Sequence, residues 1–141
     1  MMVEKVVTSG KRKEAVARAV VRPGTGLITI NKRSHLHLDK FSVLMIEEPL
    51  RIAKEILGDL KYDIDVGVRG GGREGQTEAA RLAIARALVA ASKQDDSKQS
   101  EALKKAYLLY DRNMLVADIR RKEAYKPGDS KARSKRQKSY R

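Results

Sequence analysis

The chain has 141 residues, a net charge of +13 and no cysteine. This length predicts one domain, and the lack of cysteine excludes a disulfide scaffold, a cysteine zinc site and a thiol nucleophile. No segment has the length and hydropathy of a signal peptide or a membrane span, which favours a soluble intracellular protein. Since no apolar membrane-binding face accompanies the basic excess, the expected partner is a nucleic acid, not a membrane or a small-molecule substrate.

The positive charge is concentrated at the C-terminal end of the chain. Residues 120–141 hold ten basic and two acidic side chains, a net +8, whereas residues 1–119 hold 21 basic and 16 acidic ones, a net +5. Apart from alanines and two tyrosines, this end segment has no apolar side chain, so it cannot bury enough surface to offset its ordering entropy. We therefore expect a globular body over residues 1–119 and an extended basic tail over 120–141 that becomes ordered on a polyanion.

The N-terminal part of the body is predicted to be β-structure. Val3–Thr8 is β-branched and half-polar, and Glu14–Arg22 alternates between a small apolar face and a face that carries arginines. A basic run, residues 11–13, follows Gly10 between these two segments. The small face, expected to pack closely beneath helices, comprises Ala15, Ala17, Ala19 and Val21.

The middle of the body mixes turn, helix and strand signals. The turn sequence Pro23–Gly26 leads into a strand over Leu27–Asn31, which predicts a β-hairpin. Residues 34–45 are ambiguous, and a helix is predicted over Pro49–Leu57 because proline fits the first helical turn. Tyr62–Val68 alternates and predicts a strand with one solvated face.

Two helices are predicted in the last part of the body. Thr77–Ser92 is rich in alanine, and Glu101–Tyr110 follows after a break. Residues 114–119 predict a short strand or a docking segment. In the helix predicted over Glu101–Tyr110, the side chains expected to face inward are Leu103, Ala106, Tyr107 and Tyr110. The fold class is α+β, with a small, mostly antiparallel sheet and helices on one face.

The glycine-rich stretch Gly70–Gln76 lies between a predicted strand and a predicted helix. Its glycines match the G-x-G-x-x-G dinucleotide fingerprint, but the preceding strand has a solvated acidic face and no Gly-Lys-Ser/Thr follows. We favour an anion site, because consecutive glycines turn N–H groups toward a phosphate while Arg69 and Arg73 add charge. A nucleotide-binding enzyme and a plain flexible turn are the alternatives.

Other candidate chemistry is weaker. On a strand, His35, His37 and Asp39 would share a face, as in a two-histidine, one-carboxylate metal site, but histidines in a loop more often face solvent or RNA. Asp63 and Asp65 share a predicted face and could form an acid/base pair, but such carboxylates usually solubilise the strand or pair with a lysine or arginine of a neighbouring strand. No Ser–His–Asp set is evident, so we predict no catalysis, no metal and no cofactor.

Aromatic side chains are too few for base stacking on the sheet. The predicted strands carry only Tyr62, on the face expected to be buried, and the tail carries Tyr125 and Tyr140. Affinity for RNA should therefore come from phosphate neutralisation and shape. The basic tail also fits a nuclear-import signal on a free-standing RNA or DNA chaperone, which is the rival interpretation among binding proteins.

Several stretches taken together resemble one ribosomal protein family. In chain order they are GKRKEAVARA (10–19), PGTGLITIN (23–31), GGGREGQ (70–76), YDRNMLVADIRR (110–121) and RQKSYR (136–141). They are similar to the universal small-subunit ribosomal protein S-nine family, and the last two resemble its archaeal and eukaryotic branch, called S-sixteen in eukaryotes. The likeness covers essentially the whole chain.

The resemblance implies a body of the ribosomal-S-five-domain-two type with a left-handed βαβ crossover. It implies a structural constituent of the small ribosomal subunit, in the cytoplasm, that binds rRNA of the head (the 3′ major domain) beside neighbouring ribosomal proteins. It also implies a tail that reaches the anticodon stem-loop of P-site tRNA during translation.

Candidate binding residues follow from charge and from the resemblance. Those predicted to contact rRNA are Lys11, Arg12, Lys13, Arg18, Arg22, Arg69, Gly70, Gly71, Gly72, Arg73, Gln76, Arg112, Arg120, Arg121, Lys122, Arg133, Lys135 and Arg136. Those predicted to face tRNA at the tip of the tail are Lys138, Tyr140 and Arg141.

Overall fold

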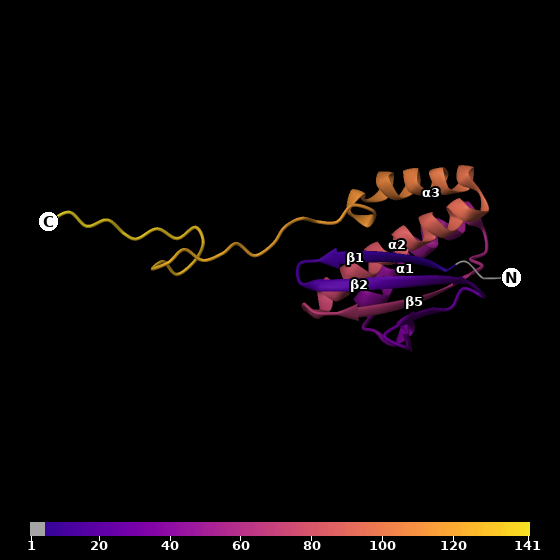
Figure 1. The fold of residues 1–141 in the computed structure, drawn as a ribbon, viewed down its shortest axis with the longest axis horizontal. Coiled ribbons are helices and arrows are strands. Elements are labelled where there is room, and N and C mark those ends of the chain that lie inside the picture. Colours follow the sequence, from indigo (N-terminus) through magenta and orange to yellow (C-terminus); the bar gives the residue numbers. More distant parts are fainter. Residues whose placement is uncertain (1–4) are drawn as a thin grey trace.

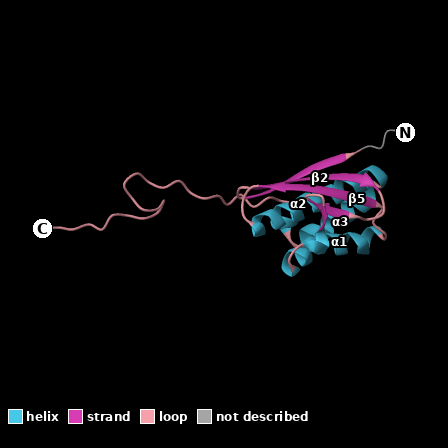
Figure 2. Cartoon of the chain, turned by 90° about the horizontal axis from the view of Figure 1, so that it is seen from below, coloured by secondary structure: helices cyan, strands magenta, loops and turns pink. Residues whose placement is uncertain are grey.

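A computed structural model of the chain describes residues 5–141, in which a layer of helices packs on one face of a single sheet (Figures 1 and 2). The strands are β1 (Val6–Arg12), β2 (Ala15–Pro23), β3 (Ile28–Ile30), β4 (Arg33–Ser34) and β5 (Tyr62–Arg69). The helices are α1 (Lys40–Leu57), α2 (Arg73–Asp95) and α3 (Ser97–Tyr110), with short 3-10 helices η1 (His35–His37) and η2 (Arg112–Met114). The predicted α+β class is confirmed.

The sheet has the strand order β1-β2-β5-β3-β4 and is mostly antiparallel. Only the β3–β5 pair is parallel among the described strands, and α1 lies in the connection between them, which gives the βαβ crossover. The predicted hairpin through Pro23–Gly26 is wrong, because β5 lies between β2 and β3. Turn composition predicts that the chain bends, but it does not show which strand fills the place alongside.

The first strand is longer than its sequence predicts. It continues through Gly10 to Arg12. Lys11 and Arg12 therefore lie at the end of β1, and only Lys13 lies in the β1–β2 turn. A side chain at Gly10 would overlap the carbonyl oxygen of Ala79 and lie 2.8 Å from the nitrogen of Ala83, both in α2. The glycine therefore allows α2 to approach β1 closely. Residues 3 and 4 of the predicted strand lie outside the described residues.

The core between the sheet and α2 is built from small side chains, as predicted. Ala15, Ala17 and Ala19 of β2 are completely buried, as are several alanines of α2. Because the side chains on both surfaces are small, the helix backbone approaches the strand closely. A close-packed interior of this kind leaves no space for extra atoms. The opposite face of β2, which carries Arg18 and Arg22, is exposed.

Helix α1 starts at Lys40, well before the predicted start at Pro49. Asp39 caps it: its carboxylate accepts hydrogen bonds from the backbone N–H of Ser42 at 3.3 Å and from the Ser42 hydroxyl at 2.8 Å. Pro49 lies inside the helix and is buried, so packing offsets the cost of about 3 kcal/mol that proline imposes on a helix interior. Gly58, with φ of 75°, ends the helix as predicted.

The segment after α3 docks on the body without forming a strand. Leu103 and Tyr107 of α3 are buried as predicted, but Tyr110 is 59% exposed because the helix ends there and turns into η2. Met114 is fully buried, and Arg86 of α2 donates hydrogen bonds to the carbonyl of Leu115 at 3.0 Å and to that of Ser9 at 2.9 Å. Side chains of α2 thus hold the last part of the body.

Candidate nucleic-acid interface

Three segments that carry predicted RNA-binding residues meet at one end of the body, which we call the basic end. They are the end of β1 with the β1–β2 turn (residues 11–14), the loop and helix start at residues 70–73, and residues 112–121. One hollow is lined by residues of the first two segments, including Lys13 and Arg73, and a second by residues of the first and third. Figure 1 shows the turn, the end of β5 and the start of the tail at this same end.

Two glycines of the 70–72 loop, Gly70 and Gly71, are explained by a close backbone approach. Gly70 and Gly71 have φ of 77° and 63°, which a residue with a side chain rarely adopts. A side chain at Gly70 would lie 2.7 Å from the carbonyl oxygen of Glu14, and one at Gly71 would lie 2.8 Å from the nitrogen of Ala15. The loop therefore packs on the β1–β2 turn, and this contact joins two of the three segments.

Helix α2 starts at this loop with backbone donors uncovered. Gly72 is its N-cap and supplies no side-chain hydrogen bond, and the first intrahelical bond runs from the Gln76 nitrogen to the Gly72 oxygen at 2.9 Å. The N–H groups of residues 73–75 have no protein acceptor among the described residues, and the helix dipole adds positive potential there. The Arg73 side chain is 80% exposed beside them and makes a long ion pair of 3.9 Å with Asp39.

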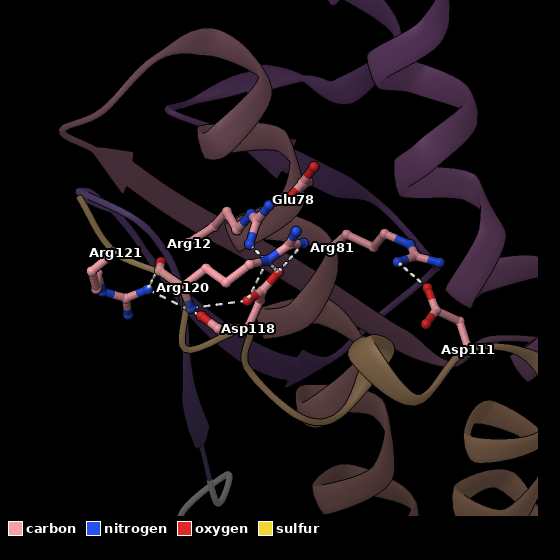
Figure 3. A network of polar contacts seen from close by, with 7 residues as sticks. All are labelled: Arg12, Glu78, Arg81, Asp111, Asp118, Arg120 and Arg121. Carbon is pink, nitrogen blue, oxygen red and sulfur yellow. Dashed lines mark hydrogen bonds and ion pairs between the residues drawn. The ribbon is translucent and has the colours of Figure 1, made fainter. Parts of the chain in front are cut away.

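Arg12 is held by acidic side chains instead of projecting into solvent (Figure 3). Its Nε lies 2.6 Å from the Glu78 carboxylate, its Nη1 contacts the Asp118 carboxylate, and the side chain is only 17% exposed. Asp118 in turn receives hydrogen bonds from the Arg120 guanidinium at 2.9 and 2.6 Å. Hydrogen bonds from Arg120, followed by the charge of Arg12, hold the pKa of the Asp118 carboxyl well below its ordinary value.

A second arginine ties the helices together next to this network. Arg81 of α2 forms ion pairs with Glu48 of α1 at 2.6 Å and with Asp111, just after α3, at 3.0 Å. Its side chain is only 12% exposed, so water and salt weaken these ion pairs less than they weaken ordinary surface pairs. Together with Arg12, it fixes the segment from which the tail departs.

The remaining predicted body residues divide between the basic end and the sheet. Lys11, Lys13, Arg69 and Arg112 are exposed at or next to the basic end. Arg18 and Arg22 lie on the open sheet face, and Arg22 is registered opposite Asp63 at the far end of β5. The structure therefore does not bring Arg22 together with the others.

The tail leaves the basic end without packing on the body (Figure 1). Residues 120–141 form neither helix nor strand. A loop within the tail is closed by Arg133, which donates to the Glu123 carboxylate at 3.0 and 2.6 Å, and Arg136 lies 3.6 Å from Asp129. Lys122 lies over the Tyr125 ring, 4.6 Å from its centre. The predicted tRNA-facing residues Lys138, Tyr140 and Arg141 are exposed at the tip.

Several of the residues that organise this region were missed by sequence reasoning. Glu78, Asp118, Glu123 and Asp129 pair with arginines that were predicted to contact RNA. Acidic residues within basic stretches are a sequence signal for such ion pairs. The sequence does not identify the partners, because several of them lie far along the chain or across a loop.

The geometry behind the metal alternative is not found. His35 and His37 lie in η1, not on a strand, and Asp39 caps α1. The His35 Nδ1 lies 3.3 Å from the carbonyl oxygen of Ile28. Asp63 has a structural role as well: its Oδ1 accepts backbone hydrogen bonds from Thr25, Gly26 and Leu27 at 2.8, 3.0 and 2.9 Å. No group of three metal-ligating side chains occurs among the described residues.

Comparison with known proteins decides the family. The model of the family described as ribosomal protein S9/S16 matches residues 10–141. The small ribosomal subunit protein uS9 of Pyrobaculum aerophilum is 47% identical over 137 residues, which cover 96% of this chain and 91% of that protein. The chain belongs to the ribosomal protein S9/S16 family. As a member of the S9/S16 family it is a structural constituent of the small ribosomal subunit and not an enzyme.

S9/S16 membership excludes the nucleotide-binding enzyme as the explanation of the glycine stretch. A dinucleotide-binding unit continues from the glycine loop through its helix into a further parallel strand. In this S9/S16 chain α2 leads into α3, and no strand follows it in the described part. Close packing on the β1–β2 turn accounts for Gly70 and Gly71. Within residues 5–141, no helix has both the length and the apolar character needed to cross a membrane.

Proposed function

We propose that this chain binds rRNA of the head of the small ribosomal subunit through its basic end, and that its tail extends from there to P-site tRNA. The observation that carries the proposal is the convergence of three basic segments, distant in sequence, at the point where the tail begins. In a cytoplasmic ribosome the chain can contact both RNA molecules and the neighbouring ribosomal proteins of the head. The body is residues 1–119 and the tail is residues 120–141.

Phosphate contacts are assigned to exposed groups at the basic end. Lys11, Lys13, Arg69, Arg73 and Arg112 are free to approach an RNA backbone, and the uncovered N–H groups at the start of α2 add neutral donors. Arg12 has a positioning role, because Glu78 and Asp118 already compensate its charge. Gly70 and Gly71 set the path of the backbone against the β1–β2 turn.

The tail supplies reach. Twenty-two residues at about 3.3 Å each span roughly 70 Å when fully extended. Since the tail starts at the surface that faces rRNA, its exposed cations can follow rRNA phosphates and place Lys138, Tyr140 and Arg141 on a second RNA. That second RNA is P-site tRNA in this proposal.

Binding measurements on a transcript of the 3′ major domain test the body. Changing Lys11, Lys13 and Arg73 to alanine should weaken binding and reduce the salt slope by about three, since each lost phosphate contact removes roughly one unit. The matched control changes three exposed lysines away from the basic end, Lys54, Lys61 and Lys93, which have the same charge effect. Equal losses in both variants would show that only net charge matters and would contradict a specific basic end.

A further inference from the structure

A separate hollow lies on the other side of the first turn of α2 from the β1–β2 turn. It encloses about 400 Å³, within the range of roughly 300–1,000 Å³ found for small-ligand pockets. Its apolar lining comes from β3, the residue after η1, α1, β5 and α2, which are distant segments of the chain. These apolar residues are Ile30, Leu38, Ile46, Val68 and Ala80.

The ionisable side chains that line this hollow are all basic. Arg33 and Arg73 line it together with His37, and no carboxylate does. Four other hollows on the described part of the chain each include at least one Asp or Glu. The combination of apolar lining and basic side chains suits a ligand with a flat, weakly polar part and an attached anion.

The polar groups of the lining are fixed by the backbone. Asn31 and Lys32 have φ of 50° and 66° and form the two-residue turn between β3 and β4. The Asn31 Oδ1 accepts the backbone N–H of Val68 at 2.8 Å, and the Gln76 Nε2 donates to the Gly70 oxygen at 3.0 Å. The Asn31 amide N–H groups and the Gln76 Oε1 have no protein partner among the described residues, so a donor and an acceptor are held at the hollow.

We propose that this hollow binds a single unpaired nucleotide of RNA, with its base against the apolar lining and its phosphate at Arg33 and Arg73. The proposal rests on the rRNA binding proposed above and names one nucleotide-sized subsite within it. An unstacked base has the required chemistry, because its faces are apolar and its edge carries donors and acceptors. Bases within an A-form helix are not open to such a hollow, so the nucleotide must lie in a loop, bulge or junction.

Arg73 connects the subsite to the basic end. It lines this hollow as well as the one shared with the β1–β2 turn. An RNA strand that crosses the start of α2 therefore passes from one hollow to the other over a single arginine. The guanidinium can contact the phosphate on either side of the unpaired base.

The test uses the full chain and a 3′ major domain transcript probed for base reactivity. In the Gln76→Glu variant a carboxylate of nearly the same size enters the lining, and Val68→Phe adds volume to it. We expect wild-type protein to protect one unpaired nucleotide, and either variant to restore its reactivity while the remaining footprint stays. Lys54→Gln, which removes an exposed cation away from the basic end, is the control and should keep the protection.

A transcript that lacks the base at the protected nucleotide provides the second measurement. The affinity of this transcript for wild-type protein should be about tenfold lower than that of the intact transcript. Replacing wild-type protein with Val68→Phe should cause no additional loss of affinity for the transcript that lacks the base. Failure of wild-type protein to bind the transcript at all would contradict the proposed function. Normal binding, with no nucleotide that responds to Gln76→Glu or Val68→Phe, would overturn the subsite alone.

Discussion

The guanidinium of Arg12, at the end of the first strand, contacts the carboxylate of Asp118, at the point where the body ends. Glu78 on one side and Arg120 on the other extend this contact into an alternating set of charges. The beginning and the end of the body are thus joined directly beneath the start of the tail. The direction in which the tail leaves is therefore determined by β1 and α2.

Asp118→Asn should loosen the end of the body without unfolding it. The amide cannot pair with Arg12 and Arg120 as a carboxylate does, so backbone amides over residues 115–121 should exchange with solvent faster. Hydrogen exchange followed by mass spectrometry measures this. Glu123→Gln, the same kind of change within the tail, is the control and should leave residues 115–121 unaffected; equal exchange in Asp118→Asn and wild type would show that the network does not hold the segment.

Gly10→Ala should destabilise the body strongly. The added methyl group overlaps the α2 backbone at Ala79, and relief requires the helix to move away from β1, at a cost of about 1–3 kcal/mol. Gly67→Ala is the matched control, because no atom lies within 4 Å of the added methyl group on the open sheet face, and its effect should stay within about 0.5 kcal/mol. Urea unfolding followed by circular dichroism compares the two, and similar midpoints would contradict the close approach of α2.

Asp63→Asn should remove an acid-sensitive part of the stability. Backbone hydrogen bonds from Leu27, Thr25 and Gly26 lower the pKa of the Asp63 carboxyl from its ordinary value of 3.8. A carboxyl with a lowered pKa stabilises the fold fully above the unfolded-state pKa, and this contribution is lost as pH falls through the folded-state value. Wild type should therefore melt higher than Asp63→Asn at pH 6, and the two melting temperatures should converge toward pH 3. A constant difference across this range would assign the effect to shape instead of charge.

Deletion of residues 138–141 should leave the body folded and able to enter the small subunit. These residues make no described contact with the body, so the melting temperature should be unchanged. Binding of tRNA to the P site of subunits that carry the shortened protein should weaken, which filter binding can measure. Failure of the shortened chain to fold would show that the tail belongs to the core and would contradict the boundary at residue 119.

Elements with a strong local pattern could be predicted from the sequence. The strand around Ala15–Val21 alternates with a period of two because one face is buried and the other is exposed. Helix α2 is a long alanine-rich run whose helical preference agrees with its burial. Helix α1 was predicted too short because Pro49 received more weight than the capping residue Asp39, although burial of the proline offsets its local cost.

Pairing between distant segments could not be predicted from the sequence. Nothing around Pro23–Gly26 shows that β5 enters the sheet between β2 and β3. The backbone groups that form hydrogen bonds are the same in every strand, so they do not specify which strand pairs with which. Equally, the basic residues of the candidate site could be named from charge, but the pairing of Arg12 with Asp118 depends on the fold. Convergence of the basic segments is therefore information that only the structure supplies.

The loop closed by Glu123 and Arg133 makes the tail shorter than its number of residues allows. An exposed ion pair of this kind is held weakly, so RNA phosphates can compete for Arg133 and release the loop. The two pairing residues are ten positions apart, and straightening that stretch would add up to roughly 30 Å of span. The tail therefore holds extra length that phosphate groups can release, so the same tail can span different distances from the body.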